Sequence, residues 1–347
     1  MKIALVHRRY TTNGGTERYL VGLSRYLVAA GHEVVVLCNE VREDLRAEPG
    51  VRFVHLPMIR LGPIPKMLSL WASAQRALNR ESWDAIMGLG RTGGHHLYRA
   101  GGGSHVDALR RTHPIRRWFS PTDWLEMALD RRAVRSARIC IANSELGARG
   151  MREDYGAQRV EVVYNGVDGA RFRPDPVRRA AVRAELGIEG PMVLFLGNGW
   201  RRKGLDVAIE AVQPPWTLCV AGGDAPWRAP AHVRFLGPQG APERILPAAD
   251  AFVLPTRYDP FANTCLEAMA AGLPTLTTPS NGVAEVVPEP WLVADTVAGF
   301  RAGLERLLDP GERTRIGAAC LEVAGRLTPE ASYRRAFALL KEAAGGQ

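Results

Sequence analysis

Two carboxylates eight residues apart, Asp259 and Glu267, stand where a predicted strand gives way to a predicted helix. Between them, Asn263 or Thr264 can cap the start of that helix, because both side chains carry an oxygen that accepts backbone N–H groups. The amides at a helix start can bind phosphate, and a carboxylate one turn further on can accept hydrogen bonds from vicinal sugar hydroxyls. The segment therefore predicts a site for a phosphorylated sugar.

A run of cations, Arg201, Arg202 and Lys203, follows the apolar pattern of residues 192–197. We expect this run to open a helix over residues 205–212. Positive charges at a helix start oppose the helix dipole, so three of them there require an external anion, such as a diphosphate. A solvated surface run is the alternative interpretation.

Paired glycines, Gly14 and Gly15, follow the first predicted strand, residues 2–7, and precede an amphipathic helix that ends at Gly31. Glycines let backbone N–H groups approach a ligand closely, and a helix N-terminus carries partial positive charge. The loop lacks the G-x-G-x-x-G spacing of dinucleotide-binding proteins. It is a second candidate phosphate site, with an ordinary tight turn as the alternative.

Basic and aromatic residues are interleaved through segment 108–138. They are Arg110, Arg111, Arg116, Arg117, Trp118, Phe119, Trp124, Arg131, Arg132, Arg135 and Arg138. This composition suits an anionic membrane surface, where each cation contributes about 1 kcal/mol of binding free energy. A nucleic-acid groove is disfavoured because no recognition motif accompanies the segment, and a solvated helix face is the remaining alternative.

Strand-like runs that alternate with helical patterns would position these residues. The runs form two series, separated by the turn-rich stretch 165–176: residues 2–7, 34–38, 51–56, 84–88 and 138–142, then residues 192–197, 218–221, 233–236, 251–255 and 275–278. The alternation predicts an α/β protein with two doubly wound parallel sheets, whose ligands bind at the carboxyl ends of the strands. We expect a first domain over residues 1–168, a second over 169–328, and a C-terminal helix, 329–347, that returns to the first domain.

The composition narrows the class of protein further. With 46% hydrophobic residues in 347, the chain is too apolar for a disordered protein. Its apolar runs fall short of the roughly 18 residues that span a membrane. The five cysteines form no C-x-x-C pair, which argues against zinc and favours a reducing cytoplasm. A net charge of +9 implies an anionic partner without identifying it.

Over nearly its whole length the sequence resembles the retaining glycosyltransferases of family 4, whose GT-B fold has two Rossmann-like domains facing a central cleft. The motifs that carry the resemblance are GGTER, L-x-x-x-G-H-E-V at 27–34, N-S-x-x at Asn143, V-x-N-G-V-D at 163–168, LFLGNGWRRKGLD, and LPTRYDPFANTCLEAMAAGLPTLTT with the residues 281–287 that follow. Three positions depart from the family pattern. Asp259 replaces the first glutamate of E-x7-E, Ala262 replaces a glycine and must keep an ordinary φ, and Asn198 replaces an arginine.

The resemblance implies a nucleotide-sugar donor bound mainly by the second domain and an acceptor bound by the first. In this interpretation Arg202 and Lys203 neutralise the diphosphate, and Glu267 holds the ribose. The diphosphate oxygens would accept hydrogen bonds from the amides of Gly15, Asn263 and Thr264, and the hexose would be positioned by Asp259 and the backbone of Phe261 and Ala262. Preorganised cations stabilise the charge that develops on the leaving group. Because the sequence contains no D-x-D motif, we expect no metal ion and no cofactor beyond the donor.

His105 matches the sugar-contacting histidine of the family and is expected to end a strand of the first domain. The glycines before it open space for a ligand, although a capping or core histidine is the alternative. Together with segment 108–138, this stretch looks like the acceptor side of bacterial lipopolysaccharide-core glycosyltransferases. Those enzymes work at the inner face of the cytoplasmic membrane.

The sequence thus predicts a retaining, metal-independent glycosyltransferase. We expect it to transfer a hexose, preferably from a UDP-sugar, to a membrane-associated glycan or glycolipid such as a lipopolysaccharide core. The expected location is cytoplasmic, with peripheral membrane contact through residues 108–138 and no nucleic-acid partner. Two alternatives stay open: a sugar-nucleotide epimerase of the same fold, and a non-enzymic basic module that binds membrane or nucleic acid. The hexose, the base and the oligomeric state are left open.

Overall fold

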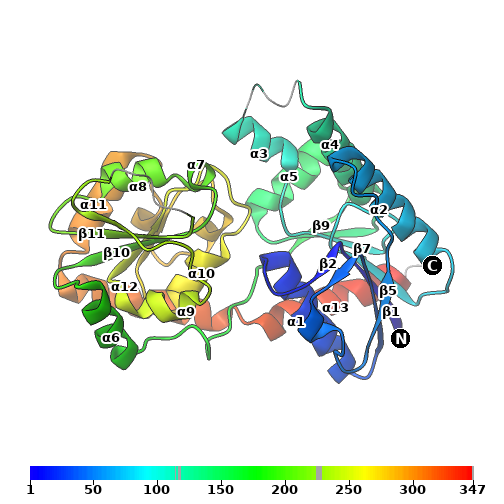
Figure 1. The fold of residues 1–347 in the computed structure, drawn as a ribbon, viewed down its shortest axis with the longest axis horizontal. Helices are drawn as coiled ribbons and strands as arrows, with labels where there is room; N and C mark the ends of the chain where they lie inside the picture. The colour runs from blue at the N-terminus through cyan, green and yellow to red at the C-terminus, as the bar shows by residue number, and fades with distance from the viewer. Residues whose placement is uncertain (114, 116–118, 224–228, 346–347) are drawn as a thin grey trace. The chain divides into compact units, whose positions relative to one another are not determined.

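The computed structural model describes residues 1–113, 115, 119–223 and 229–345. The chain forms two compact units, shown in Figure 1: unit 1 is Met1–Tyr164 with Pro329–Gln347, and unit 2 is Asn165–Thr328. Unit 2 begins slightly before the expected division at residue 168. Asn165 already belongs to it and donates a hydrogen bond from Nδ2 to Asn263 Oδ1 at 2.7 Å.

Unit 1 is built on a parallel sheet of seven strands in the order β5-β3-β1-β6-β7-β8-β9. The strands are β1 (Lys2–Val6), β3 (Glu33–Cys38), β5 (Val51–His55), β6 (Ala85–Gly88), β7 (Leu97–Ala100), β8 (Ile139–Ala142) and β9 (Val160–Val162), with β2 (Arg9–Tyr10) paired to β4 (Glu40–Val41) beside them. The helices are α1 (Gly15–Ala29), α2 (Pro63–Leu78), α3 (His105–Thr112), α4 (Pro121–Ser136), α5 (Glu145–Tyr155) and α13 (Pro329–Gly345).

The order of these strands creates a crevice in unit 1. The chain runs outward from β1 through β3 to β5 and then returns to β6 on the other side of β1. The segments that follow β1 and β6 therefore diverge at the carboxyl edge of the sheet. Such a topological switch point is where open α/β sheets bind ligands.

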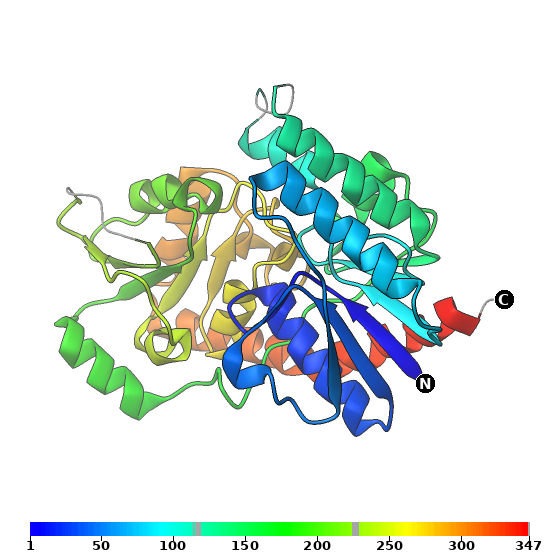
Figure 2. The same ribbon diagram turned by 45° about the vertical axis from the view of Figure 1, so that its right-hand side comes forward.

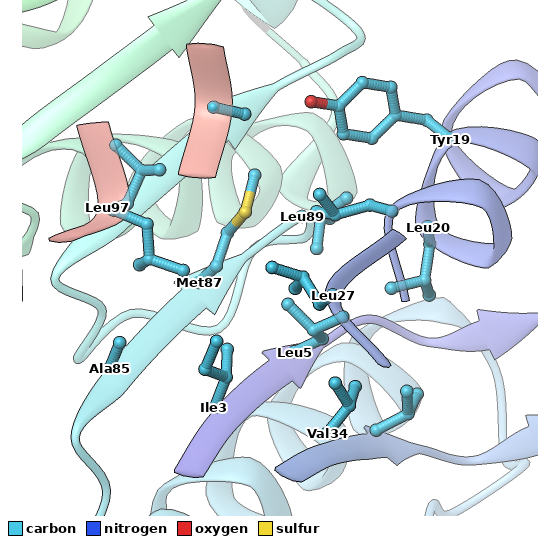
Figure 3. Close-up of a cluster of buried hydrophobic side chains, with 14 of the residues drawn as sticks. Ile3, Leu5, Tyr19, Leu20, Leu27, Val34, Ala85, Met87, Leu89 and Leu97 are labelled. Atoms are coloured by element: carbon cyan, nitrogen blue, oxygen red, sulfur yellow. The ribbon is translucent and has the colours of Figure 1, made fainter. Parts of the chain in front are cut away.

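The two faces of this sheet bury alternate residues, because successive side chains of a strand point in opposite directions. Ile3 and Leu5 of β1 pack with Tyr19 of α1 in the cluster shown in Figure 3, to which α13 adds Ala336, Leu339, Leu340 and Ala343. Ala4 and Val6 pack on the other face against α2. Figure 2 shows α13, in red at the end of the colour scale, beside this sheet. The C-terminal helix is therefore part of the core of unit 1.

Unit 2 contains a parallel sheet of five strands in the order β12-β11-β10-β13-β14. The strands are β10 (Met192–Leu196), β11 (Thr217–Ala221), β12 (Val233–Phe235), β13 (Ala251–Leu254) and β14 (Thr275–Thr277). The helices are α6 (Pro176–Leu186), α7 (Trp200–Lys203), α8 (Leu205–Ala211), α9 (Pro242–Ile245), α10 (Asn263–Ala270), α11 (Val297–Arg306) and α12 (Pro310–Arg326). Here the switch point lies between β10 and β13, so the segments after these two strands flank a crevice.

The predicted fold class is confirmed, and each strand-like run of both predicted series forms a strand whose ends agree within one residue. The prediction that residues 201–203 open the following helix is wrong. They lie in the separate short helix α7, and Gly204, with φ of +75°, divides it from α8. Within the described residues, no helix is both long and apolar enough to cross a membrane.

We predict that Gly204→Ala lowers the free energy of unfolding by at least about 3 kcal/mol, because the substitution combines a left-handed backbone with a steric clash. A Cβ at this position would lie 1.9 Å from the carbonyl oxygen of Pro255. Gly187→Ala is the matched control, since Gly187 also has positive φ but the nearest atom to its Cβ would be 3.9 Å away. We expect the control to cost about 1 kcal/mol. Urea denaturation of both full-length variants measures this, and equal losses would contradict the steric argument.

Candidate functional site

Three charged side chains meet at the switch point of unit 2. Lys203 Nζ lies 2.7 Å and Arg202 Nη1 lies 2.9 Å from the same atom, Asp259 Oδ2. The cations lie in the segment after β10 and Asp259 lies in the segment after β13, so the order of the strands brings them together. Asp259 and Lys203 are buried, whereas Arg202 is partly exposed.

These neighbours keep Asp259 ionised. Burial alone would raise the pKa of Asp259, but the charges of Lys203 and Arg202 outweigh burial and hold that pKa below its ordinary value. The other carboxylate oxygen, Oδ1, accepts a hydrogen bond from the amide of Phe261 at 3.2 Å. One carboxylate is thus shared by two cations, which an anionic ligand could also engage.

The counter-charge of Arg202 and Lys203 is therefore internal. The prediction that Arg201, Arg202 and Lys203 lie at the start of α8 is wrong, because they belong to α7, a helix of a single turn that ends before Gly204. Asp259 is the anion that the folded chain supplies to Arg202 and Lys203.

Asn281 fixes the loop that joins Asp259 to α10, a role that the sequence did not reveal. Its Oδ1 accepts from the amides of Ala262 at 3.1 Å and Val283 at 3.3 Å, and its Nδ2 donates to Thr277 Oγ1 at 2.9 Å. Ala262 has an ordinary φ of −72°, as expected for a residue that replaces glycine. The sequence analysis included Asn281-Gly282 only as part of a family motif and assigned no role to Asn281.

The start of α10 differs from the prediction. Ala262 is the N-cap residue, and no side chain of the described residues caps this helix, so the expected cap by Asn263 or Thr264 is wrong. Asn263 instead accepts the hydrogen bond from Asn165. Thr264 Oγ1 is buried without a hydrogen-bond partner among the described residues. Glu267 is buried on the same helix, one turn after its start.

In unit 1, the predicted glycine loop adjoins a carboxylate. Gly14 is the N-cap of α1 and Gly15 is its first residue, and a Cβ on Gly14 would lie 2.2 Å from Glu17 Oε2. His7, whose Nε2 lies 3.8 Å from Glu17 Oε1, lowers the pKa of Glu17 to about 2 together with Arg9 and against the effect of burial. An ionised protein side chain therefore lies at this helix start, where the sequence predicted phosphate.

His105 does not end a strand as expected. It is the first residue of α3, after the Ser104 cap, and its Nε2 lies 3.0 Å from Asp123 Oδ1 and 3.5 Å from Glu126 Oε2. These three side chains bring potential metal-ligand atoms within 4.8 Å of one another, but Arg91 Nη1 also lies 3.1 Å from Glu126 Oε2. The two carboxylates, both on α4, therefore orient the imidazole, and a guanidinium already supplies positive charge beside them.

His105 lines a cavity of about 370 Å³ at the switch point of unit 1. The polar part of its wall comes from the segments after β1, β6 and β7, and it includes His7, Arg8, Arg91, Thr92, Arg99 and Gly101–Gly103. The apolar part includes Leu70, Trp71, Leu89 and Leu129. The sequence indicated His105 here but missed the arginines, because they are scattered over separate loops and strands.

Segment 108–138 uses several of its cations internally. Arg110 pairs with Asp154 at 3.1 Å, Arg111 pairs with Asp107 at 2.9 Å, and Arg135 donates to the carbonyl of Tyr155. Arg116, Arg117 and Trp118, which were part of the predicted surface, lie outside the described residues. Among the described residues of the segment, three large apolar side chains are exposed: Ile115, Phe119 and Trp124.

The chain matches known families and proteins over both units. Residues 13–171 match Glycosyltransferase Family 4, and residues 190–310 match Glycosyl transferases group 1. A probable transglycosylase of Burkholderia thailandensis is 30% identical over 93% of this chain and 90% of its own length. A D-inositol 3-phosphate glycosyltransferase of Acidothermus cellulolyticus is 26% identical over 87% of this chain and 80% of its own.

Solved structures show the same fold. WaaG, described as a glycosyltransferase involved in lipopolysaccharide biosynthesis, superposes with a TM-score of 0.82 at 18% identity and covers 99% of this chain and 100% of its own. Anabaena HepE in complex with UDP-glucose gives a TM-score of 0.75 at 18% identity, with 99% and 100% coverage. The family matches and the named glycosyltransferase relatives favour the transferase interpretation over the epimerase and the non-enzymic module. With family matches in both units and a relative 30% identical over almost its entire length, the chain belongs to the family 4, group 1 glycosyltransferases of GT-B fold and is a transferase enzyme.

Proposed function

We propose that the protein is a retaining, metal-independent hexosyltransferase that uses a nucleoside-diphosphate sugar, preferably a UDP-sugar, as donor. The observation that carries this proposal is the Asp259 carboxylate shared by Lys203 and Arg202 at the switch point of unit 2. Two cations held by one carboxylate have capacity for a further anion. The diphosphate of the nucleotide-sugar donor would be that anion.

Donor binding would redistribute these contacts. When the diphosphate engages Lys203 and Arg202, Asp259 is released from them in part and can accept a hydrogen bond from a hexose hydroxyl. The amides of Asn263 and Thr264 lie at the start of α10, where the helix dipole favours a phosphate oxygen. Glu267, buried on that helix, would hold the ribose.

The chemical step breaks the bond between the anomeric carbon and the diphosphate and forms a bond to the acceptor oxygen. Lys203 and Arg202 stabilise the negative charge that develops on the departing diphosphate, which lowers the barrier directly. In enzymes that use a divalent ion, that ion supplies such positive charge, and here the two fixed cations would supply it. We propose front-face substitution with retention, in which the acceptor hydroxyl gives its proton to the leaving group. No protein nucleophile is assigned.

A membrane-associated glycan such as a lipopolysaccharide core is the acceptor that we propose. The fold neighbour WaaG is described as acting in lipopolysaccharide biosynthesis. The exposed Ile115, Phe119 and Trp124 of segment 108–138 support membrane contact, since apolar and aromatic side chains beside arginines suit an anionic lipid surface. This contact would be peripheral, at the cytoplasmic face.

Asp259→Asn is predicted to strengthen UDP binding several-fold while it lowers glycosyl transfer, because it removes a carboxylate that competes for Lys203 and Arg202. Lys203→Met is predicted to weaken UDP binding by about tenfold or more, the effect of losing one charge-assisted hydrogen bond. Asp206→Asn is the matched control, since Asp206 pairs with Arg257 in an exposed ion pair of the same unit. Calorimetric titration with UDP measures all three variants. Weaker UDP binding by Asp259→Asn would contradict the proposal that the diphosphate replaces Asp259 as the partner of Lys203 and Arg202.

Turnover with a donor panel tests the reaction itself. We expect nucleotide release from at least one UDP-sugar, with GDP-mannose as the comparison, and transfer to an added glycan acceptor. Lys203→Ala and Glu267→Ala should each lower this release by about a hundredfold, equivalent to roughly 3 kcal/mol of transition-state stabilisation. Full activity of both variants, or conversion of the donor to another sugar nucleotide without acceptor, would contradict the proposal.

Membrane contact is predicted to depend on segment 108–138. Binding to phosphatidylglycerol vesicles should fall when Arg116, Arg117, Arg131 and Arg132 are all replaced by Gln. The double variant Phe119→Ser with Arg131→Gln should bind about fivefold or more weakly, because each cation contributes about 1 kcal/mol of binding free energy. The matched control is Val177→Ser with Arg326→Gln, an exposed apolar and basic pair of unit 2. Vesicle sedimentation measures binding. Equal sedimentation of the test and control variants would remove the membrane proposal.

A further inference from the structure

The cavity of unit 1 has the size and position of a ligand site. Its volume of about 370 Å³ falls at the small end of the range of small-molecule pockets, roughly 300–1,000 Å³. It lies at the carboxyl ends of β1, β6 and β7, where the strand order creates a switch point. One wall carries Leu70, Trp71 and Leu129, which suit the apolar face of a sugar ring. A single saccharide unit therefore fits the space.

The carboxylates that line this cavity already have partners. Asp130 Oδ1 lies 2.8 Å from Arg91 Nε, and Glu17 Oε1 lies 2.9 Å from Arg9 Nη2. The pKa of Glu17 is about 2, so this carboxylate stays ionised and paired at neutral pH. The negative charges of the wall are therefore balanced within the protein before any ligand enters.

Arg8 adds a positive charge that is not balanced in this way. Its side chain lines the cavity and is only partly exposed, and within the described residues no hydrogen bond or ion pair engages its guanidinium. Burial lowers the pKa of Arg8, and the charge of Arg9 adds to this effect, while Glu17 and Glu40 offset it in part. A partly desolvated cation gains free energy from an anion that reaches it.

Arg99 brings a second guanidinium to the same wall. It is buried on β7, and its guanidinium carbon lies 3.7 Å from the centre of the Tyr19 ring. Gly101 makes room for it: a Cβ there would lie 2.8 Å from Arg99 Nη1 and 2.7 Å from Thr16 Oγ1. The loop backbone therefore lies directly against this cation.

We propose that the cavity of unit 1 binds the acceptor through an anionic substituent, a phosphate or a carboxylate carried on a sugar, with Arg8 as its ion-pair partner and Arg99 as a second cation behind it. This inference rests on the proposed function, because it names the class of acceptor. The sugar ring lies against Trp71 and Leu129, and the anion points toward β1 and β7. A neutral sugar would leave Arg8 without a counter-charge.

Calorimetric titration of the full chain tests the proposal with four probes: glucose 6-phosphate, glucose 1-phosphate, glucuronate and glucose. We expect at least one anionic probe to bind about tenfold more tightly than glucose, a difference that corresponds to one charge-assisted hydrogen bond or ion pair. Arg8→Gln should remove this preference and leave the binding of glucose unchanged. Equal binding of glucose and all anionic probes, or no binding of any anionic probe at millimolar concentration, would overturn the proposal.

Arg60→Gln is the matched control, because Arg60 lines a neighbouring hollow together with Arg8 but does not line the cavity. It should keep the preference for anionic probes. Titration with UDP shows whether each variant is folded and tests the donor site separately. If the unmodified protein does not bind UDP, the proposed function is contradicted. If it binds UDP but shows no preference for anionic probes, only the present inference is contradicted.

A lipid headgroup could supply the same chemistry as a sugar phosphate. Binding of each variant to phosphatidylglycerol vesicles separates the two sources. We expect Arg8→Gln to reduce the binding of sugar phosphates and to leave vesicle binding at the level of Arg60→Gln. Reduced vesicle binding with unchanged binding of sugar phosphates would assign Arg8 to lipid and overturn the proposal.

Discussion

The ionised Asp259 carboxylate, shared between Lys203 and Arg202, is the interaction on which the site of unit 2 depends. A buried charge is tolerated only when close partners compensate it, and the distances of 2.7 and 2.9 Å provide that compensation. The arrangement requires the segments after β10 and β13 to meet. Gly204 makes the meeting possible, because its left-handed backbone turns the chain against the carbonyl of Pro255 without a side chain to collide.

Each unit places its charged residues at the point where its strand order reverses. In unit 2 this brings one carboxylate to two cations, and in unit 1 it brings several arginines to a cavity whose carboxylates are already paired. Parallel sheets expose diverging loops at this edge, so the same topology generates a potential ligand site twice. The chemistry of the two sites differs because the loops differ, which is why fold alone does not assign substrates.

The structure corrects the sequence-based predictions mainly in the loops. The helix of residues 205–212 was expected to begin with the basic run, but a glycine of positive φ divides that run from α8. Asn263 or Thr264 was expected to cap α10, yet the side chain of Asn263 bonds to Asn165, almost a hundred residues earlier. His105 begins a helix and is held by carboxylates of another helix. For Asn263 and His105, the partner of the side chain lies outside the segment from which the prediction was made.

The sequence by itself determined ten of the twelve strands of the two parallel sheets, their two series and the family, because burial of both faces of a parallel sheet imposes continuous apolar runs that are readable locally. The predicted series did not include β7 and β9. It also marked Lys203, Asp259 and Glu267 as chemically important. Only the tertiary structure decided which charges compensate one another. Lys203 and Asp259 lie 56 residues apart, and Arg8, Arg91 and Arg99 come from three different segments. In each unit, the order of strands in the sheet brings these residues to the same edge, and a local pattern of residues does not encode that order.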